Sequence, residues 1–145
     1  MPRVGRVLLT PDWRGANPYL DLLASGDKTA DALFYLGRFA EGERRPDQAL
    51  RMYSQVDRGA LVIAAQQRAA AMLRERDGVP AAIAHLDQFV ARHPRHGLDL
   101  MPVKASLYAA GEYYDQALAA YDTYLEIKPR AEFAWLARAD AVLRS

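Results

Sequence analysis

The sequence predicts an all-α fold, a right-handed stack of helical hairpins, and three observations support this prediction. A small residue followed four places later by a large one recurs after 33 and then 35 residues, at Ala49/Tyr53, Ala82/Leu86 and Ala117/Tyr121. A proline lies twelve places after the second and third of these alanines. Glycines divide the apolar periodicity into helix-length segments, at positions 42, 59, 78, 97 and 111. A period of about 34 residues is typical of helical hairpins that stack on their neighbours.

The composition is that of a soluble globular chain and argues against several classes of function. The 145 residues are 51% hydrophobic and 26% charged, and the formal net charge is +1. Nucleic-acid-binding domains normally carry a clear excess of basic residues, so we expect no nucleic-acid partner. The chain has no cysteine, which excludes disulfides, thiolate metal sites and cysteine nucleophiles.

The N-terminal residues resemble neither a signal peptide nor a membrane span. The apolar run Val7-Leu8-Leu9 is shorter than the roughly 7 to 15 residues of a secretory signal core. No other window approaches the roughly 20 apolar residues that cross a bilayer. We therefore expect a cytoplasmic protein without a membrane span, or an envelope protein if the sequence is a fragment of a longer chain.

The first 28 residues do not follow the repeat, and we expect an irregular arm followed by a short helix. Asn17 and Pro18 are a helix cap and a first-turn proline, and Gly26 is a helix stop. The arm carries Trp13, which either packs on the domain or contacts a partner.

The repeat domain is predicted to span residues 29–145. Pro46, Pro80 and the Asp77-Gly78 pair mark helix starts and stops within the hairpins. Pro102 is compatible with a helix that starts near Asp99, because it then lies in the first turn. The predicted hairpins cover residues 29–59, 61–94 and 98–129, and a lone helix covers residues 131–144.

The recurring small residues indicate where two antiparallel helices of one hairpin approach each other. We expect such contacts on the first helices at Gly37, Ala70 and Ala105, and on the second helices at Ala49, Ala82 and Ala117. A long coiled coil is the competing all-helical fold, and it needs an unbroken apolar repeat of 3.5 residues. The repeated glycines exclude that alternative.

The chain resembles the tetratricopeptide repeat (TPR) family over about residues 29–145. The resemblance rests on the Leu-Gly opening at 33–37, the second-helix segments 47–53 and 114–121, and the closing prolines Pro94 and Pro129. Three features depart from the family pattern: the first repeat has no closing proline, Lys104 stands where leucine is usual, and the gap from Gly111 to Ala117 is one residue longer than the family's norm. Residues 34–68 show a weaker resemblance to internal repeats of bacterial envelope TPR adaptors, whose lipidated cysteine is absent here.

The resemblance implies a scaffold or adaptor that binds a partner peptide or protein in a concave groove formed by the first helices. The partner-binding candidates are Phe34, Arg38, Gln67, Arg68 and Arg74, with Asp31, Ala71 and Ser106 beside them. The arginines either grip a partner's carboxylates or are solvated surface charges. The family's carboxylate clamp is not matched, because the corresponding positions hold Phe34, Arg38, Arg68 and Asp99.

Two alternatives remain: a self-assembling structural unit, and a substrate-recruiting segment of a larger enzyme. The last helix has too many apolar residues for one stripe, which predicts a weak homo-oligomer through Phe133, Trp135, Leu136, Val142 and Leu143. No nucleophile motif, phosphate loop or isolated acid pair is present, so we expect neither catalysis nor a cofactor. His93 and His96 flank Pro94 in a turn without a third ligand, so we expect no metal site.

Overall fold

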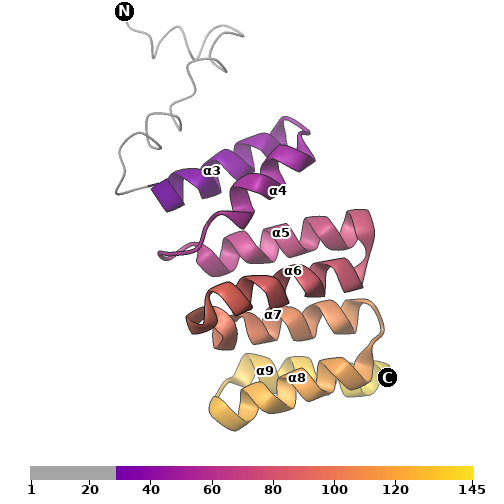
Figure 1. Ribbon diagram of the computed structural model, residues 1–145. Helices are drawn as coiled ribbons and strands as arrows, with labels where there is room; N and C mark the ends of the chain where they lie inside the picture. Colours follow the sequence, from indigo (N-terminus) through magenta and orange to yellow (C-terminus); the bar gives the residue numbers. More distant parts are fainter. Residues whose placement is uncertain (1–28) are drawn as a thin grey trace, which may run out of the picture. The chain divides into compact units, whose positions relative to one another are not determined.

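The computed structural model describes residues 29–145, which form seven α-helices and one short 3₁₀ helix, without a β-strand in that range (Figure 1). The predicted all-α fold is therefore confirmed. The chain divides into two compact units, Met1–Ala65 and Gln66–Ser145, and the division falls within one helix. The predicted N-terminal arm, the helix from Asn17 and the placement of Trp13 lie outside the described residues.

In the first unit, helix α3 (Thr29–Gly42) packs against α4 (Pro46–Ser54). The contact needs a glycine, because a Cβ atom on Gly37 would lie only 2.6 Å from Cε1 of Tyr53. Tyr53 is fully buried, and its hydroxyl donates a hydrogen bond to the Glu41 carboxylate. The small residue Gly37, which the sequence marks as a helix contact, thus receives the aromatic ring of Tyr53, a partner that the sequence pattern does not predict.

The second unit contains most of α5 (Val62–Asp77), then α6 (Val79–Arg92), the 3₁₀ helix η2 (Pro94–His96), α7 (Gly97–Ala110), α8 (Tyr114–Ile127) and α9 (Glu132–Arg144). Helix α7 packs on α6, α8 and α9, and α8 also packs on α9 (Figure 1). Their shared core includes Ala105, Tyr121, Tyr124, Leu125 and Ala134. The unit is therefore built of adjacent helices in chain order, as stacked hairpins require.

Helix α7 begins earlier than the sequence predicts, at Gly97 rather than near Asp99. The 3₁₀ helix leads directly into it, with the His96 N–H donating to the His93 carbonyl at 3.1 Å. Pro102 consequently lies inside the helix and not in its first turn. Because proline has no backbone N–H, one hydrogen bond of the helix is not formed at this position.

A positive φ angle recurs between the two helices of each hairpin. Positive φ angles occur at Arg44 (58°), Gly78 (96°) and Glu112 (66°), three positions spaced 34 residues apart, each between the two helices of a hairpin. Around two of them the same bonds recur: the Arg44 N–H donates to Glu41 and the Glu112 N–H to Ala109, both at 3.0 Å. Only Gly78 carries the residue type that favours this conformation. Gly78 has a ψ angle of 173° and leads directly into α6, so the shared turn belongs to the first and third hairpins, where neither arginine nor glutamate marks it in the sequence.

Candidate functional site

The candidate site is a hollow of about 320 Å³ in the second unit, which we call the α5–α7–α9 groove. Alternate helices supply most of its lining, and α8 contributes two tyrosines at its base. The lining residues are Gln67, Asp99, Pro102, Val103, Ser106, Tyr121, Tyr124, Phe133 and Ala137.

One part of the groove is aromatic. The rings of Tyr124 and Phe133 lie with their centroids 5.8 Å apart. Tyr124 is 8% exposed, whereas Phe133 is 55% exposed. A buried ring thus supports a large accessible one, an arrangement that offers an apolar contact to a partner side chain.

The other part of the groove is polar. Gln67, Asp99 and Ser106 are exposed and supply an amide, a carboxylate and a hydroxyl group. Together they can donate to and accept from the main chain of an extended peptide. Asp99 is the one charged residue in this lining, so the groove itself favours a donor or a cation over an anion.

Tyr121 adds a hydroxyl that stays protonated at neutral pH. Its burial, reinforced by the negative charge of Asp140, raises the pKa of the phenol above its ordinary value of 10.0. Tyr121 is 4% exposed, so it forms the base of the groove and not its rim.

The structure brings some of the predicted partner-binding residues together. Gln67 and Ser106 line the groove. Arg74 follows Gln67 by two helical turns and is exposed on the same face of α5. Arg68 is also exposed but lies about 100° further round the helix, outside the lining. Ala71 is half-buried on the face that Gln67 and Arg74 share.

The remaining candidates belong to the first unit. Arg38 and Asp31 are exposed on α3. Phe34 is only 8% exposed, and its ring packs against Tyr53 and Tyr35 at centroid distances of 5.7 and 5.4 Å. Phe34 lies one turn before Gly37, on the face that meets Tyr53, so little of its ring is available to a partner.

A second hollow, of about 490 Å³, was not anticipated from the sequence. It lies among α6, α7 and α8 and is lined by Leu86, Asp87, Val90, Gly97, Leu100, Met101, Lys104, Tyr108, Gln116, Ala119, Ala120 and Thr123. Lys104 Nζ forms an ion pair with Asp87 Oδ1 at 2.7 Å. The one indication of this hollow in the sequence was Lys104 at a position where the family usually has leucine. Its acidic partner could not be identified from the sequence, because Asp87 lies 17 residues away on another helix.

The three histidines have structural contacts. His85 shares a hydrogen bond with the fully buried Gln66, with 2.8 Å between Nε2 and Oε1. His93 and His96 lie against Phe89, with ring centroids 4.8 and 6.0 Å away. Within residues 29–145, no group of three side chains that could hold a metal ion occurs.

We expect the protein to lose stability as the pH falls below about 6.5, because His85 is buried. Burial, and secondarily the charge of Arg92, lowers the pKa of His85 from its ordinary value of 6.5. The unfolded chain therefore binds a proton at a higher pH than the folded chain, so the free energy of unfolding decreases as the pH falls from 6.5 towards the folded pKa. Urea denaturation at closely spaced pH values measures this slope.

A His85→Gln variant is the matched control for this pH effect. Glutamine can still donate a hydrogen bond to Gln66 but does not titrate. The slope between pH 7 and 5 should be shallower in the variant. An unchanged slope would assign the acid sensitivity to other groups.

Comparison with known proteins supports the fold and leaves the family open. No known family model matches the chain, and no curated protein sequence matches it. A crystal structure of MamA superposes with a TM-score of 0.56 at 20% identity, covering 85% of this chain and 72% of that chain. A second crystal structure of MamA protein gives a TM-score of 0.54 at 20% identity, with coverages of 85% and 67%.

At this identity the likeness shows the fold alone, which is a TPR-like helical solenoid. None of the helices in the described part of the chain has both the length and the apolar character needed to cross a membrane.

Proposed function

We propose that this chain is a protein-interaction module of the TPR type, a scaffold or adaptor that holds a segment of a partner protein in the α5–α7–α9 groove. The exposed ring of Phe133 beside the exposed polar groups of Gln67 and Ser106 is the observation that carries the proposal. Concave sites that combine an aromatic anchor with a few polar groups are typical of peptide recognition.

The chemistry of the groove defines the segment that would fit. An apolar side chain packs on Phe133 and Tyr124, while Gln67 and Ser106 bond to the adjacent main chain. Asp99 repels an acidic side chain at the next position of the bound segment, so that position should hold a basic or hydrogen-bond-donating side chain. Arg68 and Arg74 lie outside this lining and would pair with acidic residues that flank the anchored one.

Replacing Phe133 by alanine should weaken peptide binding at least tenfold. The probe is a random peptide library selected on the parent chain, and the affinities of the selected peptides are then measured by titration. Truncation of a central aromatic anchor commonly costs about 2 kcal/mol or more. Ile127→Ala is the matched control, because Ile127 is 56% exposed and lies outside the groove lining. If the selected peptides bind the Phe133→Ala variant and the parent equally well, the α5–α7–α9 groove is not the peptide-binding site.

The arginines have a separate test. The double variant Arg38→Glu/Arg68→Glu should lose affinity for acidic peptides and keep its helical circular dichroism, since exposed charges contribute little to stability. Arg68→Glu/Arg74→Glu tests the pair on α5. Unchanged affinity in both variants would mean that these arginines take no part in peptide binding.

A further inference from the structure

The second hollow, of about 490 Å³, lies on the side of α7 opposite the α5–α7–α9 groove, and we call it the α6–α7–α8 trough. Helix α7 lines the groove with Asp99, Pro102, Val103 and Ser106, and the trough with Gly97, Leu100, Met101, Lys104 and Tyr108. At about 100° per residue, these two sets lie on opposite faces of the helix. A ligand in the trough would therefore leave the groove open.

The trough is elongated along α7. The row of α7 residues from Gly97 to Tyr108 is about 16 Å long, and α8 lines it from Gln116 to Thr123. Helix α6 lines the other side. The volume is within the roughly 300 to 1,000 Å³ of ligand sites, and the shape suits a row of side chains better than one compact group.

Most of the trough lining is apolar. Leu86 and Leu100 are fully buried, and Val90 and Met101 are half-buried. Apolar side chains of a ligand are removed from water when they pack here, which is favourable. The flexible methionine can adapt to their shape.

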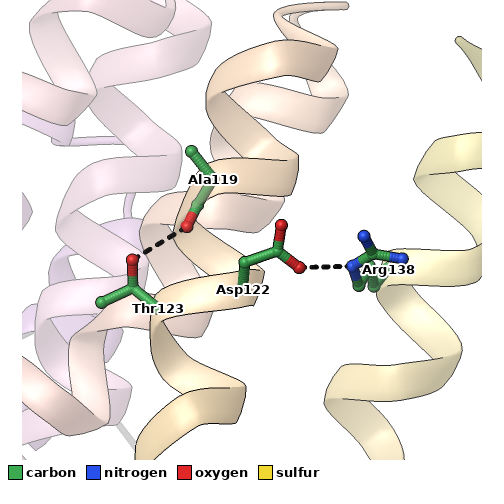
Figure 2. A network of polar contacts seen from close by, with 4 residues as sticks. All are labelled: Ala119, Asp122, Thr123 and Arg138. Atoms are coloured by element: carbon green, nitrogen blue, oxygen red, sulfur yellow. Dashed lines mark hydrogen bonds and ion pairs between the residues drawn. The ribbon is translucent and has the colours of Figure 1, made fainter.

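Few polar groups of the trough are available to the main chain of a ligand. On α8 the Thr123 hydroxyl donates to the Ala119 carbonyl of its own helix at 3.0 Å (Figure 2). An extended segment would leave buried main-chain groups without partners, which costs free energy. Because a helix satisfies its own main-chain groups, an amphipathic helix suits this surface better.

The trough contains an ion pair. Lys104 Nζ lies 2.7 Å from Asp87 Oδ1, and the two side chains are 33% and 54% exposed. Neither has another polar partner among the described residues, so two N–H groups of the ammonium and the second carboxylate oxygen are available to a ligand. The pair is neutral as a whole, and an acidic ligand group is repelled by Asp87 as a basic one is by Lys104.

A carboxamide group matches this ion pair. Its oxygen can accept a hydrogen bond from Lys104 while its N–H group donates one to Asp87. An apolar group over the pair would remove it from water without replacing those bonds. In the α7 row Lys104 lies between Met101 and Tyr108, so apolar contacts flank the polar one.

We propose that the α6–α7–α8 trough binds an amphipathic helix of a partner protein, which presents two apolar side chains with a glutamine or asparagine between them. Positions i, i+4 and i+7 of such a helix share one face and span about 10 Å, which is within the length of the trough. The site is additional to the groove, so the chain can join two partners.

The probe is a synthetic helical peptide of about 18 residues, alanine-rich and therefore helical by itself, with leucine, glutamine and leucine at i, i+4 and i+7. Titration of the 145-residue chain, followed by fluorescence anisotropy, measures its affinity. This peptide should bind about tenfold or more tightly than versions with glutamate or lysine at the central position. Absence of binding, or equal affinity of the three peptides, overturns the proposal.

Replacing the ion pair should change the preferred central residue. The Asp87→Leu/Lys104→Leu variant should prefer a peptide with leucine at the centre, because the polar partners of the carboxamide are gone. Asp122→Leu/Arg138→Leu is the matched control, since it removes an ion pair between α8 and α9 outside the trough lining (Figure 2). A preference for glutamine that persists in the trough variant contradicts the assigned contact.

The location and the helical form of the ligand have their own tests. Met101→Glu should weaken binding of the glutamine peptide about tenfold or more, since it places a charge in the apolar contact. Ala91→Glu, exposed on α6 outside the lining, is the control, and circular dichroism checks that both variants fold. A folded Met101→Glu variant with parental affinity places the peptide elsewhere. A peptide with proline beside the central glutamine should bind weakly, and equal binding contradicts a helical ligand.

The trough and the groove can be distinguished. Phe133→Ala should leave the affinity for the glutamine peptide unchanged, because Phe133 lines the groove and not the trough. Peptides bound in the groove should keep their affinity for the Asp87→Leu/Lys104→Leu variant. The two proposals can therefore fail independently.

Discussion

A Tyr53→Ala variant is expected to lose about 3–5 kcal/mol of its free energy of unfolding, the usual cost of truncating a buried aromatic residue. Tyr53 is fully buried, packs its ring on Phe34 at 5.7 Å and bonds its hydroxyl to Glu41. Small domains are stable by only about 5–15 kcal/mol, so this loss removes a large share of the stability. Urea denaturation followed by circular dichroism measures the loss, with Tyr53→Phe as the control that removes the hydroxyl alone.

Gly37 provides the complementary half of this test. Gly37→Ala places a Cβ atom 2.6 Å from the Tyr53 ring, so in the parent it should cost about 1–3 kcal/mol through overpacking. In the Tyr53→Ala background the ring is gone, and the same change should be neutral or stabilising because alanine favours helices by about 1 kcal/mol. An equal cost in both backgrounds would mean that the ring does not set the need for glycine.

An Ala117→Leu variant should lose about 1–3 kcal/mol, because the added carbons have no space in a packed interface. Ala117 is fully buried on α8, which packs against α7 and α9. Ala119→Leu is the matched control, since Ala119 lies on the same helix and is exposed. Thermal unfolding compares the two variants, and equal melting temperatures would place Ala117 outside the tight contact.

The sequence predicted the contact positions well because they depend on local periodicity. The alanines of the recurring pattern, Ala49, Ala82 and Ala117, are all fully buried. Each alanine and the large residue four places on lie on one helical face by geometry alone. Ala70 and Ala105 on the first helices are also fully buried, for the same reason.

The candidate site was predicted only in part. Gln67 and Ser106 line the groove, as their helical register suggested, but the accessible aromatic residue is Phe133 and not Phe34. Both residues are phenylalanines on first helices. Phe34 is buried because Tyr53 of the next helix lies against it, and no local pattern reports which ring a neighbouring helix will cover.

By itself the sequence determined the helical hairpins, their small contact residues and the turn positions marked by glycine and proline. Each follows from interactions within a few residues along the chain. The tertiary structure alone decided the ion pair of Lys104 with Asp87, that of Arg138 with Asp122, the buried partner of His85 and the covering of Phe34 by Tyr53. Each of these contacts joins residues about 16 to 19 positions apart on different helices, and periodicity within one helix carries no information about them.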